Sequence, residues 1–365
     1  MSRATLLFLS LLGTLLLAVP AHAATKAGIA VKDATWKVGA SAGQFTDDTG
    51  PMGTDKQGNQ TFDPNLLTTK KRISDGVALK TSTRAIVIED GESDKVAIVS
   101  TDLYLPQDFL LRRVAGILAQ HDLTTSGPKT GITYENLAMT ASHNHMTPYY
   151  STPGWGTAIF QDAFDLRFFE YMAQNMADAV IAANKKMVPV RMGGATRTFD
   201  AIQSHTYGPQ VGDDGTPAGQ PRDHTTKQVS VVALEDISNP RRPKPFANWV
   251  VFGVHPEYSM WGSDLINGDI THAAARMVDR ELKTTSLFTQ RETGASGPHN
   301  GSQVHPPEPR RDFHDEGMGQ MDRAARLFAD AIKATLTDIR TGTPERKSAY
   351  QPWTSDFDVA TVSKN

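Results

Sequence analysis

Runs of apolar and β-branched residues, separated by polar turns, predict most of the strands of this chain. Residues 84–89 (RAIVIE) and 96–101 (VAIVST) are two such runs, and the polar segment 90–94 between them indicates a buried hairpin. The segment NWVVFGV at residues 248–254 is nearly all apolar, which is typical of a strand covered on both faces. Further strands are expected at residues 36–38, 135–141, 190–198, 228–234 and 286–290.

Apolar residues spaced three and four positions apart predict helices between these strands. Helices are expected at residues 106–120, 161–185, 271–283 and 316–340. Because strands alternate with helices, the pattern favours an α/β fold with mixed, mostly buried β-sheets flanked by helices. No internal repeat or linker divides the chain, so we expect residues 24–365 to form one domain.

The first 23 residues have the pattern of a secretory signal peptide. Arg3 precedes an apolar run at residues 6–19, and small residues at positions 21 and 23 suit a signal peptidase. This run is shorter than the ~20 apolar residues that a membrane anchor needs. We therefore expect cleavage after Ala23 and a periplasmic or secreted protein.

The composition narrows the candidate chemistry. The chain has no cysteine, which excludes cysteine-based metal sites and thiol nucleophiles. Its formal net charge of −3 gives no indication of a nucleic-acid partner.

Three histidines follow the ends of predicted buried strands. His143 and His145 come directly after the strand at 135–141, and His255 ends the strand at 248–254. Strand ends open into the functional crevice of many α/β proteins, and imidazole is both a metal ligand and a general base. The alternative is that the first two are ordinary loop histidines and the third is a core histidine held by a backbone carbonyl.

Two further residues are candidates for catalysis. Asp102 follows the strand at 96–101 and is a candidate to orient an imidazole, although a helix N-cap or turn role fits equally well. Ser296 lies in a glycine-rich segment after the strand at 286–290, where a serine nucleophile or an oxyanion site can form. The alternative for Ser296 is a plain flexible turn, since the G-x-S-x-G spacing is missing.

Taken in order, these segments resemble the neutral ceramidase family. The resemblance runs from Trp36 to Asp358 with matching order and spacing. Its elements are residues 84–89 (family R-A-F-V-I-E), 100–103 (N-T-D-L), 141–145 (T-H-T-H), 248–255 (the strand ending in the second metal histidine) and 288–300 (F-A-Q-x-N-x-G-x-x-S-P-N).

The resemblance implies a neutral-ceramidase-like catalytic domain that depends on zinc. In it, His143 and His255 would bind the metal, and His145 would lie beside it as a supporting or acid/base group. The reaction would hydrolyse the amide bond of an N-acylated lipid, met at a membrane surface, to a fatty acid and a sphingoid base.

The chain also departs from the family pattern. The family's serine falls at or near Gly297, one place after Ser296, and its remaining zinc ligands, a glutamate and a tyrosine, come from a region later than Asn365. Glu257, Asp269 and His299 are local candidates to complete the site. Two alternatives therefore stand beside the ceramidase-like amidase: a non-catalytic exported binding domain, and a metal hydrolase of another amide or ester.

Overall fold

The computed structural model describes residues 24–38, 74–148, 165–199, 201–205, 228–259, 265–293, 296–298, 314–343 and 350–355. The expected signal peptide at residues 1–23 and the ligand candidate His299 lie outside these residues. Within the described part of the chain, no helix combines the length and apolar character needed to span a bilayer.

The described elements alternate between strands and helices, as the sequence predicts. The helices are α1 (Asp108–Thr124), α2 (Leu166–Asn184), α3 (Asp269–Leu282) and α4 (His314–Thr341). The strands are β1 (Lys26–Asp33), β2 (Gly76–Leu79), β3 (Ser82–Glu89), β4 (Lys95–Thr101), β5 (Leu137–Ala141), β6 (Val188–Thr198), β7 (Gln203–His205), β8 (Gln228–Asp236), β9 (Lys244–Phe252), β10 (Leu265–Asn267), β11 (Thr285–Gln290), β12 (Ser296–Pro298) and β13 (Gln351–Thr354).

Nine of the strands form one mixed sheet. Its order is β11-β9-β8-β6-β1-β3-β4-β5, and β13 pairs with β6. The β11/β9 and β4/β5 pairs are parallel, whereas the β1/β3, β3/β4, β6/β8 and β8/β9 pairs are antiparallel. The predicted hairpin is confirmed as β3 and β4, with Glu89 opposite Lys95.

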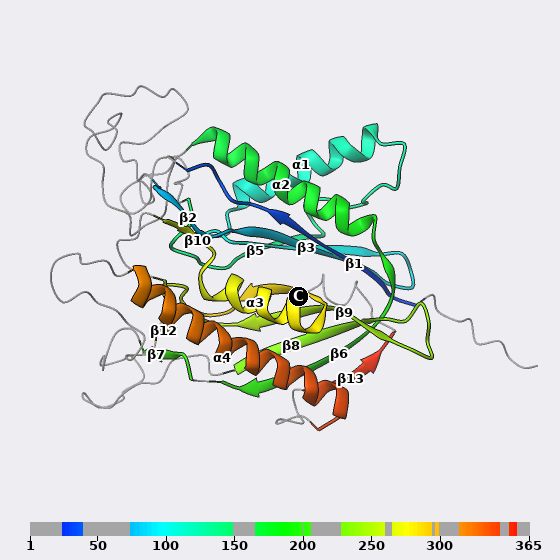
Figure 1. The fold of residues 1–365 in the computed structure, drawn as a ribbon. Helices are drawn as coiled ribbons and strands as arrows, with labels where there is room; N and C mark the ends of the chain where they lie inside the picture. Colours follow the sequence, from blue (N-terminus) through cyan, green and yellow to red (C-terminus); the bar gives the residue numbers. More distant parts are fainter. Residues whose placement is uncertain are drawn as a thin grey trace, which may run out of the picture.

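The sheet folds over at the short junction between β1 and β6, so that its two halves face each other between two layers of helices (Figure 1). Helices α1 and α2 cover the half made of β1, β3, β4 and β5, and α3 and α4 pack against the half made of β6, β8, β9 and β11. Three apolar clusters separate the four layers. Alternation along β3 explains the layering, because Ala85 and Val87 face α2 while Ile86 and Ile88 face the opposite half-sheet.

The α/β class and the mixed, helix-flanked sheet are confirmed. The strand at 248–254 is also covered on both faces, since Val250 and Phe252 belong to the cluster on the helix side and Trp249 packs against the cluster between the two half-sheets. The helix and strand boundaries differ from the sequence-based ones by a few residues, which is the usual uncertainty of such boundaries.

One predicted strand is wrong, and its neighbour was missed. Residues 36–38 are not a strand; Trp36 instead packs its ring edge-on against Phe168 of α2, with ring centroids 5.4 Å apart. The strand of this region is β1, whose Gly28 lies so close to α2 that an added Cβ would come within 1.9 Å of the Ala183 carbonyl oxygen. Small residues that allow this contact weaken the apolar signal of β1 in the sequence.

Candidate metal centre

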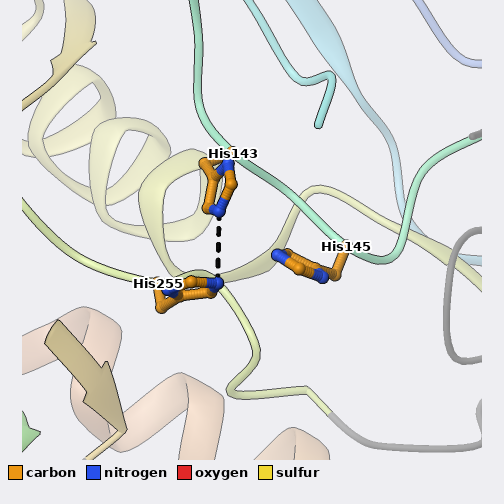
Figure 2. A group of neighbouring side chains, drawn as sticks. All are labelled: His143, His145 and His255. Atoms are coloured by element: carbon orange, nitrogen blue, oxygen red, sulfur yellow. Dashed lines mark hydrogen bonds between the residues drawn. The ribbon is translucent and has the colours of Figure 1, made fainter. Parts of the chain in front are cut away.

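Two strand ends from opposite half-sheets bring two histidines into contact. His143 lies two residues after β5, and His255 lies three residues after β9. Their Nε2 atoms are 3.1 Å apart, although 112 positions separate them in the chain (Figure 2). The structure thus produces the convergence that the sequence suggests.

Backbone carbonyls fix the orientation of both rings. The Nδ1 atom of His143 lies 3.0 Å from the carbonyl oxygen of Tyr104, and that of His255 lies 3.1 Å from the carbonyl oxygen of Thr293. A carbonyl oxygen only accepts hydrogen bonds, so each Nδ1 carries the hydrogen and each Nε2 presents a lone pair. Two such lone pairs facing each other at this distance suit a shared cation. Metal-binding histidines usually donate their other ring N–H to an oxygen acceptor, as both of these do.

Burial keeps both imidazoles neutral. It lowers the pKa of His143 to about 4, with a further contribution from the nearby His255. Burial likewise lowers the pKa of His255. Because metal ligation needs the unprotonated ring, both side chains are in the binding form at neutral pH.

His145 lies beside this pair. The nitrogen atoms that His143, His145 and His255 can offer all lie within 4.8 Å of one another, a group compatible with a metal ion. Burial lowers the pKa of His145 well below its ordinary value. Tyr104, three residues after β4, contacts two of these rings: it stacks on His143 and meets His145 edge-on.

A carboxylate reaches the same cluster. Glu257 Oε1 lies 3.4 Å from His255 Nε2 and 3.5 Å from His145 Nδ1. Burial raises the pKa of Glu257 to about 7, and the negative charge of Asp269 adds to this effect. Of the two local candidates that the structure describes, Glu257 and Asp269, Glu257 is the one that lies beside the histidines, although the group of metal-ligand atoms consists of the three imidazoles alone.

The donor set fits a zinc-sized cation. Zinc binds imidazole nitrogen and carboxylate oxygen at ~2.0–2.2 Å, so two donor atoms of a tetrahedral site lie about 3.3 Å apart. The distances of 3.1 Å between the two Nε2 atoms and 3.4 Å from His255 Nε2 to Glu257 Oε1 match this spacing. Imidazole also suits copper, iron and nickel, so the geometry supports a divalent metal site without selecting the metal.

Gln290, the last residue of β11, joins the two chain segments that carry the histidines. Its side-chain Nε2 donates to the carbonyl oxygens of Ser142 and Val254, at 3.0 and 2.5 Å, and its Oε1 accepts from the Val254 N–H. Ser142 and Val254 are the residues directly before His143 and His255. One amide side chain thus sets the distance between the two segments.

A buried carboxylate also fixes the segment that follows His255 and Glu257. Asp269 is fully buried and accepts hydrogen bonds from the N–H and hydroxyl of Ser259 and from the N–H of Tyr258. This carboxylate therefore supports the segment that follows Glu257 and is outside the metal-ligand group of the described residues. His143 itself has a positive φ of 62°, a strained conformation of the kind that clusters at functional sites.

The two remaining candidates lie elsewhere. The Asp102 carboxylate accepts from the N–H and hydroxyl of Ser82 and lies 2.9 Å from His272 Nδ1, so the imidazole that it orients is His272 of α3. Ser296 lies in β12, opposite His205 of β7. The catalytic roles suggested for Asp102 and Ser296 stay predictions.

The sequence reasoning did not single out Tyr104 or Gln290 as parts of the site. Both lie at or shortly after strand ends, Tyr104 three residues after β4 and Gln290 at the end of β11, as the histidines do. That shared position is the signal by which they could have been found, because the ends of neighbouring strands meet at one edge of the fold.

The fold and this cluster define the class: an α/β domain with a candidate metal site at the meeting point of two half-sheets. No model of a known protein family matches the chain. Neutral ceramidase A of Dictyostelium discoideum is 24% identical over 201 residues, which are 54% of this chain and 27% of that protein.

Two solved structures share the fold. Neutral ceramidase from Pseudomonas aeruginosa superposes with a TM-score of 0.57 at 14% identity, covering 86% of this chain and 45% of the other. A ceramidase complexed with C2 gives a TM-score of 0.59 at 16% identity, covering 86% of this chain and 44% of the other. The chain therefore shares the fold of these neutral ceramidase structures and is similar in sequence to part of a neutral ceramidase, and it spans less than half the length of each of these relatives.

Proposed function

We propose that this chain is a zinc-dependent amide hydrolase of ceramidase type, which cleaves an N-acylated lipid into a fatty acid and an amine. The observation that carries the proposal is the pair of Nε2 lone pairs of His143 and His255, facing each other at 3.1 Å. The similarity to ceramidases in sequence and fold supports the choice of an amide substrate.

In this proposal His143 and His255 hold the zinc ion. When bound, zinc supplies the polarisation of the amide carbonyl and the acidification of water that such hydrolases use. The neutral imidazole of His145 accepts a proton from the attacking water and delivers it to the leaving nitrogen as the C–N bond breaks. The products are a carboxylic acid and an amine.

We also propose that residues 24–365 act as one domain in the periplasm or outside the cell, after removal of the signal peptide that residues 1–23 resemble. The substrate would then be met as a lipid at a membrane surface. Mass spectrometry of the mature protein from the culture supernatant and the periplasmic fraction tests the cleavage, with an N-terminus at Ala24 as the expected result.

Purified protein incubated with zinc and dialysed tests the function itself. We expect about one zinc ion per chain and release of fatty acid from an N-acyl sphingoid base, abolished by a chelator and restored by zinc. His143→Ala should lose both zinc and activity. Protein that stays metal-free after this treatment would falsify the proposal, and a panel of other amides and esters separates a different substrate from a non-catalytic binding domain.

A further inference from the structure

A cavity lies between α3, α4 and β2, on residues that the candidate metal centre does not use. Its volume is about 840 Å³, and none of the described residues that line it belongs to the group of three imidazoles. The two helices run side by side (Figure 1). We propose that this cavity binds one single-chain amphiphile with an anionic headgroup, a carboxylate or a phosphate, which lies at Arg276 and Arg280.

The size and the walls of the cavity fit an alkyl chain. Protein sites for small molecules typically measure ~300–1,000 Å³ and are lined mainly by apolar side chains. Here the apolar lining consists mainly of one leucine and three methionines: Leu79, Met277, Met318 and Met321. Met321 is buried, and the other three are partly exposed beside the buried cluster of this half-sheet. Because methionine side chains are flexible, they adapt to alkyl chains of different lengths.

Hydrogen bonds hold these walls in position. The Gly268 N–H donates to the carbonyl oxygen of Leu79, at 3.1 Å, which fixes β2 against the start of α3. The Asn267 side-chain amide donates to the sulfur of Met318, at 3.1 Å, and lies 3.7 Å from the sulfur of Met321. The walls from three elements are therefore in place before a ligand arrives, which lowers the entropic cost of binding.

Two arginines give the cavity an uncompensated positive charge. Arg276 and Arg280 are exposed, lie four positions apart on α3 and make no ion pair within the part of the chain that the structure describes. The aspartates of the lining, Asp279 and Asp322, are each already paired with another arginine. Like charges at this helical spacing repel each other, so an anion bound between them is stabilising. Guanidinium groups also match the two-point hydrogen bonding of carboxylate and phosphate.

The combination of charge and lining selects an anionic amphiphile over other small ligands. A cation would meet two free guanidinium groups, while both aspartates of the described lining are already occupied by arginine. A purely polar anion would leave the methionine walls without an apolar partner, and a neutral lipid would leave the arginines without an anion. A headgroup with negative charge on a single alkyl chain satisfies both parts of the cavity.

Calorimetric titration of the full chain, kept metal-free by a chelator, tests the proposal. The probes are decanoate, decyl phosphate and decyltrimethylammonium, each below its micelle concentration. We expect one saturable site for at least one of the two anions and none for the cation, and the preferred anion identifies the headgroup. Arg276→Gln combined with Arg280→Gln should weaken binding about tenfold or more, since hydrogen bonds to a charged group are lost. Arg241→Gln combined with Arg242→Gln, on an exposed turn, is the matched control and should leave binding unchanged.

A second variant tests the apolar part of the cavity. Ala78 lines it from an exposed position of β2, so Ala78→Trp should obstruct the alkyl chain and weaken binding about tenfold or more. Ala119→Trp, at an exposed position of α1, is its control. Circular dichroism checks that each variant is folded.

Three results would overturn the proposal: no saturable binding of either anion, equal binding of the cation, or unchanged affinity in either the double arginine variant or Ala78→Trp. Because the titration is made without metal, any of these results leaves the proposed hydrolase function standing.

Discussion

At the scale of single residues, Gln290 holds the two halves of the candidate site together. Its hydrogen bonds end on the residues that directly precede His143 and His255. Removing a buried side chain of this kind leaves its backbone partners unsatisfied, at a cost of ~1–3 kcal/mol for each group. The metal site and the local stability therefore depend on the same amide.

We expect Gln290→Leu to lower the free energy of unfolding by about 3 kcal/mol and to weaken zinc binding by 10–100-fold, as loss of a ligand-supporting contact typically does. Denaturant unfolding and zinc competition measure the two effects. Gln120→Leu, at an exposed position of α1, is the matched control and should change neither. If Gln290→Leu binds zinc as tightly as the control, the Gln290 side chain does not position the histidines.

Glu257 gives the metal-free protein a defined pH dependence. Its folded-state pKa is raised from 4.5 to about 7, so the folded protein binds an extra proton between these values. The favourable contribution of this carboxyl to stability is complete below pH ~4.5 and is lost as the pH rises through about 7. At alkaline pH the buried carboxylate therefore destabilises the metal-free fold.

In the presence of a chelator, Glu257→Gln should be more stable than the unaltered protein at pH 8, by up to about 3 kcal/mol, because it cannot ionise. At pH 4 the two should be equally stable. Urea unfolding at both pH values checks this. The same stability difference at pH 4 and pH 8 would contradict the raised pKa.

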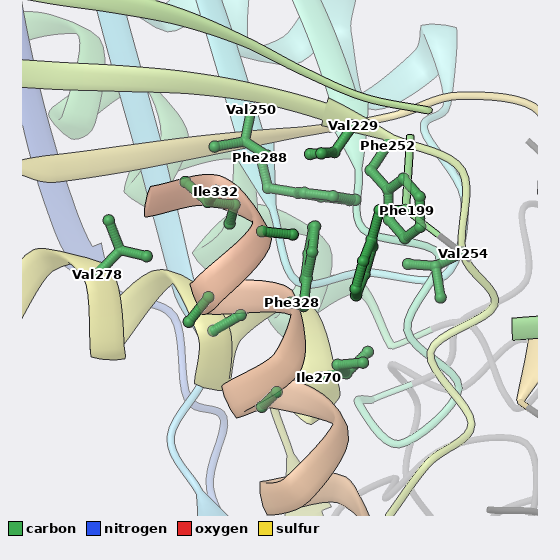
Figure 3. Close-up of a cluster of buried hydrophobic side chains, with 14 of the residues drawn as sticks. Phe199, Val229, Val250, Phe252, Val254, Ile270, Val278, Phe288, Phe328 and Ile332 are labelled. Carbon is green, nitrogen blue, oxygen red and sulfur yellow. The ribbon is translucent and has the colours of Figure 1, made fainter. Parts of the chain in front are cut away.

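At the scale of elements, α4 covers the half-sheet that carries His255. Phe328 of α4 is fully buried against Phe199, Phe252 and Phe288 (Figure 3). The adjacent Leu327 is 47% exposed. Helical periodicity thus places one of two neighbouring apolar residues in the core and the other in solvent. The pair offers a direct test of which face of α4 stabilises the fold.

Phe328→Ala should lower the free energy of unfolding by about 3–5 kcal/mol, since it creates a cavity among packed aromatic rings. Leu327→Ala should cost less than about 0.5 kcal/mol. Chemical denaturation of both variants, without metal, makes the comparison. Similar losses in the two variants would be inconsistent with the packing of α4.

At the scale of the whole molecule, the candidate site lies where the two half-sheets meet. His143 follows β5 of one half, His255 follows β9 of the other, and β11 contacts both. Polar contacts also join the two sides of the fold away from this site, including the Arg84–Asp279 ion pair between β3 and α3 at 2.7 Å. A metal ion bound to both histidines would cross-link the two halves, so its binding energy would count toward global stability.

Zinc at a free concentration 100 times its dissociation constant should therefore stabilise the unaltered protein by about 2.7 kcal/mol. A chelator should reverse the effect, and Mg²⁺, which prefers oxygen ligands, should not reproduce it. Thermal unfolding of the unaltered protein and of His143→Ala checks this. A zinc-dependent rise in Tm that persists in His143→Ala would place the metal elsewhere.

The sequence by itself determined the type and order of most elements, because hydrophobic periodicity is a local property that each segment carries alone. It also placed His143, His145 and His255 at strand ends. The sequence pattern did not predict strands β1, β2, β10 and β13, since short or small-residue strands are stabilised by partners far along the chain rather than by their own pattern.

Only the tertiary structure decided which strand ends meet. The pairing of His143 with His255 across 112 positions, the side chain of Gln290 between their loops and the approach of Glu257 to two imidazoles all depend on how the sheet folds over. It likewise assigned Asp102 to His272 and not to the histidine cluster. Such contacts result from long-range packing, which no local pattern of polar and apolar residues encodes.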